Sequence, residues 1–240
     1  MTTLVIPGDA IPTSSSSLTV GPGITSSLSR SSQTPNLIAI KAGHLISEKG
    51  KGKADNAPVD SVIVESSSKR YIPAPKDLVL GTIIHRHSEG YRVDLGSAQM
   101  ASLDALAFEG ATKRSKPNLK VGTLVYARVT IASRDMEPEL ECFDAATGKS
   151  DGFGELKGGC VVTVSLQLAR QLLNPKFTLL QTLASSIPFE IAIGINGKVW
   201  IKSPSISETI ALKRVLEGVD EGQFGITKGE LDRAVKEFAA

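Results

Sequence analysis

The fold is decided by the stretch Asp77–Gly96, which reads DLVLGTIIHRHSEGYRVDLG. Its first eight residues are rich in Leu, Val and Ile and are typical of a strand. Its last part alternates with period two, so Tyr91, Val93 and Leu95 share one face of a second strand. The polar residues between the two runs predict the turn of a hairpin. The stretch therefore predicts two neighbouring strands of a β domain.

Further strands follow at 119–131 and 140–143, each bounded by turn residues. Several short strands within about eighty residues suit a small closed barrel of the OB type. We therefore predict a barrel domain over residues 68–148.

Residues 1–67 read as a small β domain with a loose insert. Short apolar runs predict strands near 37–42 and 62–64. Serines dominate 25–35, which predicts an exposed loop, and residues 49–53 (KGKGK) predict a basic, glycine-rich loop tip.

Residues 149–240 change to a mixed pattern, which predicts an α+β domain. The helix expected near its C-terminal part has Ser207 as its N-cap. The expected strands and helices are, in order, strand 161–164, helix 166–173, helix 177–185, strand 189–193, strand 198–202, helix 207–218 and helix 228–238.

Composition limits the classes of function. The net charge of the 240 residues is only +2, so phosphates require a local basic patch. Aromatic residues make up 5%, which favours charge over base stacking in any RNA contact. Cys142 and Cys160 form neither a disulfide framework nor a zinc quartet, and they suit a reducing compartment. Neither a signal peptide nor a membrane span is recognisable, so we expect a soluble intracellular protein.

The strongest basic cluster is Lys113-Arg114-Ser115-Lys116-Pro117-Asn118-Leu119-Lys120. In an OB-type barrel, such a loop borders the nucleic-acid face. Lys113, Arg114 and Lys116 are therefore predicted to neutralise RNA phosphates. A solvated loop that is basic by chance is the alternative.

A second cluster, His85-Arg86-His87, precedes Arg92 in the expected hairpin. Arg86 and Arg92 are candidates for contacts to the RNA backbone, and an exposed polar hairpin is the alternative. The two histidines suggest a metal pair, but His44 lies in another segment and no ligand set is complete. We therefore predict no metal site.

Carboxylates alternate at Glu137, Glu139 and Glu141, and grouped carboxylates can hold Mg²⁺ in a nuclease. Two-metal nucleases gather their acids from separate elements, however. A period-two acidic run is more typical of the solvated face of an edge strand. No catalytic residue is therefore predicted.

Gly194-Ile195-Asn196-Gly197 has the spacing of the G-x-x-G clamp with which KH domains bind RNA. That clamp lies between two helices, whereas these residues lie between two apolar strands. We therefore predict a hairpin turn, with Asn196 and Gly197 both suited to positive φ. Trp200, in the following strand, is predicted to pack in a core or between domains.

An ordered series of motifs resembles the cap subunits of the eukaryotic RNA exosome. It runs from about residue 4 to about residue 218, and no single motif decides it. The motifs are VIPGD (5–9), GPGI (21–24), SKRYIPAPKDLVLG (68–81), LVYARV (124–129), LECFD (140–144), GFGEL (152–156) and IGINGKVWI (193–201).

The resemblance implies an N-terminal β domain, an S1 barrel and a KH domain. It implies that Gly194, Asn196 and Gly197 form the structural KH motif of the family. It also implies RNase PH-like ring subunits and other S1/KH cap subunits as partners, in the nucleus, nucleolus and cytoplasm. The segment 100–109 lacks a histidine that well-studied RNA-binding S1 domains carry.

We therefore expect a non-catalytic subunit that guides single-stranded RNA into the central channel of the complex for 3′-to-5′ processing and decay. It would need no cofactor, small-molecule substrate or membrane. A pure scaffold and a metal-dependent ribonuclease using Glu137, Glu139 and Glu141 remain the alternatives.

Overall fold

The structure is a computed structural model that describes residues 3–12, 18–27, 36–48, 60–66, 68, 70–133, 135–144, 147–175, 177–223, 225 and 228–239. The chain divides into two compact units, Met1–Ser67 and Ser68–Ala240. The basic loop tip 49–53 and most of the serine-rich run, residues 28–35, lie outside the described residues.

The first unit is built from short strands in two sheets, ordered β1-β6-β7-β3 and β2-β5-β4. Aliphatic side chains, among them Val5, Leu37 and Val64, fill its core. The predicted loop starts later than expected, because residues 25–27 pair with β5. The strands are β1 (Thr3–Val5), β2 (Ala10–Ile11), β3 (Leu18–Val20), β4 (Ile24–Ser27), β5 (Asn36–Ala39), β6 (Gly43–Glu48) and β7 (Asp60–Glu65).

The second unit begins with the predicted barrel. Its sheet order is β12-β10-β9-β8-β11-β13, and the pairing of β12 with β11 closes it. Inward residues such as Val79, Val93 and Leu103 are fully buried. The strands are β8 (Leu78–Arg86), β9 (Gly90–Asp94), β10 (Ala101–Phe108), β11 (Leu124–Ile131), β12 (Glu139–Cys142) and β13 (Gly154–Leu156). The sheet thus continues past residue 148, where the sequence predicts a domain boundary.

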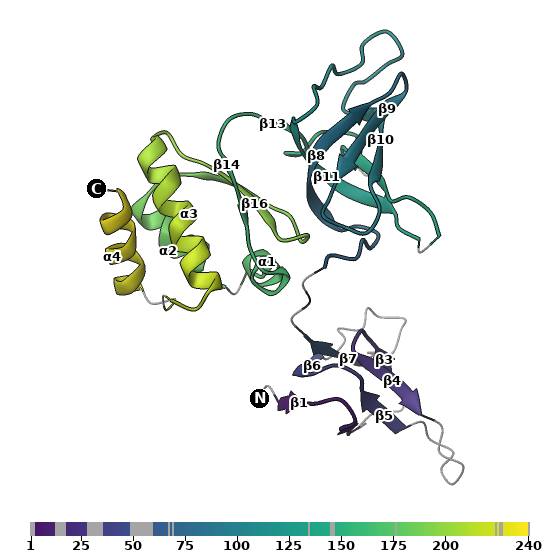
Figure 1. Ribbon diagram of the computed structural model, residues 1–240, viewed down its shortest axis with the longest axis vertical. Coiled ribbons are helices and arrows are strands. Elements are labelled where there is room, and N and C mark those ends of the chain that lie inside the picture. Colours follow the sequence, from purple (N-terminus) through teal and green to yellow (C-terminus); the bar gives the residue numbers. More distant parts are fainter. Residues whose placement is uncertain are drawn as a thin grey trace. The chain divides into compact units, whose positions relative to one another are not determined.

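An α+β domain follows, with sheet order β14-β16-β15 and helices over one face of the sheet (Figure 1). Its helix α1 has the predicted bounds. The elements are β14 (Cys160–Thr163), α1 (Leu166–Leu173), α2 (Leu179–Ser186), β15 (Glu190–Ile193), β16 (Lys198–Lys202), α3 (Ile206–Asp220) and α4 (Lys228–Ala239). No described helix is long and apolar enough to cross a membrane.

The N-terminus of α3 corrects one prediction. Its N-cap is Ser205 rather than Ser207, and no side-chain cap bond is formed. The Thr209 hydroxyl contacts the backbone at this helix start instead. It donates to the Ser205 carbonyl and accepts from the Ser203 amide. Serines at positions 203, 205 and 207 left the starting residue ambiguous in the sequence.

The barrel and the α+β domain share a small apolar interface. Leu80 of β8 packs with Ala192 and Trp200 on the face of the sheet that the helices leave open. The Trp200 indole also donates to the Gly158 carbonyl at 2.8 Å. Packing of Trp200 between domains, one of its two predicted roles, is therefore confirmed.

Candidate nucleic-acid interface

One side of the barrel carries a hollow of about 570 Å³. Its wall comes from β9 and β10, the second and third strands of the barrel, which is the face on which OB folds bind oligonucleotides. The turn between β8 and β9 and the segment before β12 form its rim. The lining residues are His85, His87, Glu89, Gly90, Tyr91, Arg92, Ser102, Asp104 and Glu137.

The predicted basic cluster, here called the basic segment (residues 113–120), lies in the connection from β10 to β11. The side chains of Lys113, Arg114 and Lys116 are exposed. The Lys116 Nζ atom donates to the Ser88 carbonyl at 3.4 Å, in the turn that borders the hollow. The structure thus places the basic segment beside the candidate ligand face.

The two arginines of the hairpin differ in charge compensation. Arg86 is exposed, and its guanidinium donates to the neutral side-chain carbonyl of Asn118. Arg92 instead forms an ion pair of 2.7 Å with Glu137. Arg86 therefore keeps its positive charge available for a phosphate, whereas Glu137 offsets the charge of Arg92. The sequence treats the two as equal candidates, because the long-range contact to Glu137 leaves no local pattern.

The ring of Tyr91 offers no base-stacking platform in the hollow, because Tyr91 is only 4% exposed. The other aromatic side chains of the lining, the imidazoles of His85 and His87, are exposed. The Tyr91 ring meets Phe108 edge-on, with centroids 6.4 Å apart.

The lining carries three carboxylates, Glu89, Asp104 and Glu137, against one arginine. The cations available for RNA phosphates are therefore those of the basic segment and Arg86, and not those of the wall of the hollow.

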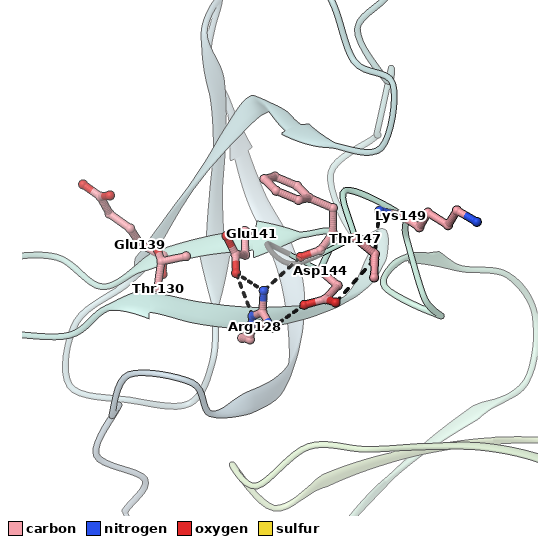
Figure 2. Close-up of polar contacts among 8 residues, drawn as sticks. Arg128, Thr130, Glu139, Glu141, Asp144, Thr147 and Lys149 are labelled. Carbon is pink, nitrogen blue, oxygen red and sulfur yellow. Dashed lines mark hydrogen bonds and ion pairs between the residues drawn. The ribbon is translucent and has the colours of Figure 1, made fainter.

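The alternating carboxylates do not converge on one site. Glu137 is bound to Arg92, whereas Glu141 accepts from Arg128 Nε at 2.6 Å on a separate part of the barrel. Glu139 is exposed and points away from Arg128 in Figure 2. The acids also lie near or within β12, which pairs with both β10 and β11. The prediction of an edge strand was therefore wrong, since β12 closes the barrel.

Arg128 is the centre of a charged cluster at that closure. Its guanidinium also donates to Asp144 at 3.0 Å (Figure 2). The same guanidinium lies 5.9 Å from the ring centroid of Phe153. The hydrogen bond to Glu141 is the main cause that raises the pKa of Arg128. Glu141 and Asp144 thus both bind the guanidinium of Arg128. Among the described residues, no group of three or more His, Cys, Asp or Glu is placed to hold a metal ion.

Residues 194–197 form the predicted hairpin turn between β15 and β16. The Gly197 amide donates to the Gly194 carbonyl at 3.1 Å. Gly197 has φ +78°, but Asn196 is not among the residues with positive φ, which corrects that part of the prediction. A Cβ at Gly197 would lie 2.6 Å from the Val164 carbonyl, so glycine is required there for space as well as for conformation.

Asn196 joins the two domains of the second unit. It is 8% exposed, and its side-chain amide donates to the carbonyls of Leu80 and Leu95, both at 2.8 Å. Its side-chain oxygen accepts from the Leu80 amide at 3.2 Å. Gly194 makes room for this contact, because a Cβ there would lie 2.8 Å from the Leu80 nitrogen. The motif thus holds the α+β domain against the barrel, a role that its sequence alone does not reveal.

The connection between α1 and α2 is where a KH domain carries its glycine clamp. Here residues 174–178 read NPKFT and contain no glycine. The G-x-x-G spacing occurs in the hairpin (194–197) and again at Gly222–Gly225, between α3 and α4, but not between α1 and α2. The usual backbone-gripping loop is therefore missing from the connection between α1 and α2.

Comparison with protein families supports this architecture. Residues 71–154 match the S1 domain of exosome complex component RRP40, and residues 159–207 match a KH domain. A solved structure of a protein described as an exosome complex RNA-binding protein shares the fold, with TM-score 0.58 and 23% identity. The match covers 70% of this chain and 95% of that one.

Named relatives extend the match over most of the chain. Exosome complex component rrp40 of Schizosaccharomyces pombe is 51% identical over 86% of this chain and 83% of its own length. Its Saccharomyces cerevisiae counterpart is 42% identical over 99% of this chain and 98% of its own length. The Drosophila melanogaster protein is 38% identical over 91% of this chain and 90% of its own length. The chain therefore belongs to the RRP40 family of exosome complex components, with an S1 and a KH domain.

Proposed function

We propose that this chain is a non-catalytic cap subunit that guides single-stranded RNA into the central channel of the exosome. The observation that carries the proposal is the group of cations beside the hollow of the S1 barrel. Lys113, Arg114, Lys116 and Arg86 are exposed, and none of them is in an ion pair among the described residues. They do not line the hollow itself, but Lys116 contacts the turn at its rim and Arg86 contacts Asn118 of the basic segment.

Such contacts would neutralise phosphates and release counterions without reading the base sequence. They suit a subunit that must pass any RNA toward nucleases elsewhere in the complex, in rRNA maturation, RNA decay and surveillance. The KH domain, which lacks a glycine clamp between α1 and α2, would act mainly in holding the barrel.

We propose RNase PH-like ring subunits and other S1/KH cap subunits as the protein partners, in the nucleus, nucleolus and cytoplasm. Membership of a family of exosome components supports a place in an assembly.

The test is RNA protection by the reconstituted complex. Replacing Lys113, Arg114 and Lys116 by Glu should weaken protection of single-stranded RNA and leave subunit stoichiometry unchanged. A control with the same charge change at the exposed residues Lys41, Lys149 and Lys157 should protect RNA as the wild type does. Undiminished protection by the first variant would contradict the proposal.

A scaffold role is the second candidate, and one feature favours it. An apolar hollow of about 450 Å³ lies elsewhere on the barrel, beside the 77% exposed side chain of Ile72. Exposed apolar surface of this kind is typical of protein contacts. Loss of assembly, rather than of RNA protection, on charge reversal in the basic segment would favour the scaffold role.

A further inference from the structure

The hydroxyl of Tyr91 reaches from the barrel core to the backbone of the basic segment. Tyr91 belongs to β9, and its ring is buried. The hydroxyl donates to the Pro117 carbonyl and accepts from the Leu119 amide at 3.3 Å. One side chain thus satisfies two backbone groups of a loop, and Leu119 is itself 4% exposed.

The neighbouring residues complete this attachment. Lys116 contacts the Ser88 carbonyl, and the side-chain carbonyl of Asn118 accepts from Arg86. Residues 116–119 therefore each contact the hairpin of β8 and β9. The basic segment is held against the hairpin by side chains that carry no negative charge.

Two physical consequences follow for an RNA ligand. A loop that is already ordered loses less conformational entropy when phosphates bind to it, so its affinity is higher. A neutral hydrogen-bond partner orients Arg86 without cancelling its charge, whereas Glu137 cancels that of Arg92.

We propose that Tyr91 and Asn118 are positioning residues for RNA. Tyr91 fixes the basic segment that presents Lys113, Arg114 and Lys116, and Asn118 holds Arg86 beside that segment. This inference rests on the proposed function of the basic segment, and it assigns RNA affinity to two uncharged side chains.

Tyr91→Phe removes the hydroxyl and keeps the ring. With a fluorescent single-stranded RNA and the reconstituted complex, we expect binding to weaken about fivefold, as for the loss of about one hydrogen bond. The slope of log affinity against log salt should stay that of the wild type, because every cation remains. Unchanged affinity, or a changed salt slope, would overturn the role of Tyr91.

A second background separates positioning from general stability. When Lys113, Arg114 and Lys116 are replaced by Ala, Tyr91→Phe should cause little further loss, because there is no cation left to position. An equal loss in both backgrounds would show a merely structural effect and overturn the proposal. If the triple Ala variant itself bound RNA as well as wild type, the proposed function would fail, and the positioning role with it.

Asn118→Asp tests the second residue by placing a carboxylate against Arg86. We expect a loss of RNA affinity that largely disappears in an Arg86→Ala background. Ser115→Asp adds the same charge to the same segment, but Ser115 has no contact with Arg86, so its loss should persist in that background. If the two Asp variants behaved alike in both backgrounds, Asn118 would have no positioning role.

Discussion

A single polar side chain, that of Asn196, contributes strongly to the stability of the folded chain. Replacing it by Ala would leave one amide and two carbonyls of Leu80 and Leu95 without their partner in a buried interface. We expect the free energy of unfolding to fall by about 3 kcal/mol. Urea unfolding followed by the fluorescence of Trp200, the single tryptophan, which is buried in the same interface, would measure it.

Asn118→Ala is the matched control, since Asn118 is an exposed residue with one side-chain partner. It should change the free energy of unfolding by less than about 1 kcal/mol. Equal losses for the two variants would contradict the interface role of Asn196.

Cys142 gives a prediction at the same scale. Burial is the main cause that raises the pKa of its thiol from 9.0 to about 12. The thiolate is the reactive form, so iodoacetamide should modify the partly exposed Cys160 first and Cys142 only after unfolding. Equal rates for both thiols in the native chain would contradict this prediction.

The same shift makes the barrel less stable in alkali. The unfolded chain loses the thiol proton near pH 9, whereas the folded chain keeps it until about pH 12. The stability linked to the protonated thiol is therefore complete below pH 9 and is lost as the pH rises toward 12. Urea midpoints across this range should fall more steeply for the wild type than for Cys142→Ala.

Residue-scale roles were predictable only where they depend on local sequence. The exposure of Lys113, Arg114 and Lys116 follows from a polar, proline-containing loop. The pairing of Arg92 with Glu137 joins residues 45 positions apart, and the contact of Asn196 with Leu80 spans 116 positions. Contacts of this kind arise from barrel closure and domain packing, so no local sequence motif predicts them.

At the scale of elements, β12 carries two carboxylates in different surroundings. Glu141 is bound to Arg128, and their side chains are 13% and 21% exposed, whereas Glu139 faces solvent. We expect Glu141→Gln to lower the free energy of unfolding by about 1–3 kcal/mol, because it weakens a charged hydrogen bond. Glu139→Gln should have an effect below about 0.5 kcal/mol. The opposite order in chemical denaturation would contradict the structure of the barrel closure.

The N-termini of α1 and α3 in the KH domain allow a similar comparison. The Ser165 hydroxyl caps α1 by accepting from the Leu168 amide at 3.1 Å, and it also donates to Asp220 at the end of α3. Ser165→Ala should cost about 1 kcal/mol or more in thermal or urea unfolding. Ser207→Ala should cost little, since Ser207 lies inside α3 and does not cap it. A larger loss of stability for Ser207→Ala than for Ser165→Ala would indicate that Ser207 caps α3, as the sequence predicts.

Elements with clear periodicity, such as α1 and β9, were predictable from the sequence. Strand β10 was not, because its sequence ASLDALAF contains alanine, serine and aspartate, which have low strand propensity. Its alternation is nevertheless that of a barrel strand, with Ala101, Leu103 and Ala105 buried. The small residues of β10 are thus buried because neighbouring strands surround them, which their own sequence does not predict.

At the scale of the whole molecule, the net charge of +2 conceals a local asymmetry. Arg128 at the barrel closure and Arg92 in the hollow are paired with carboxylates. The basic segment and Arg86 have neutral partners among the described residues instead. A nearly neutral chain therefore still presents one exposed basic segment without carboxylate partners among the described residues, and the proposed guidance of RNA depends on that segment.

The most direct measurement is photo-crosslinking of single-stranded RNA to the assembled complex, with mass-spectrometric mapping of the crosslinked peptides. If the basic segment guides RNA, crosslinks in this chain should concentrate in residues 85–92 and 113–120. They should decrease when Lys113, Arg114 and Lys116 are replaced by Glu. Crosslinks found only in other regions of the chain, or crosslinks that the replacement leaves unchanged, would contradict this role of the basic segment.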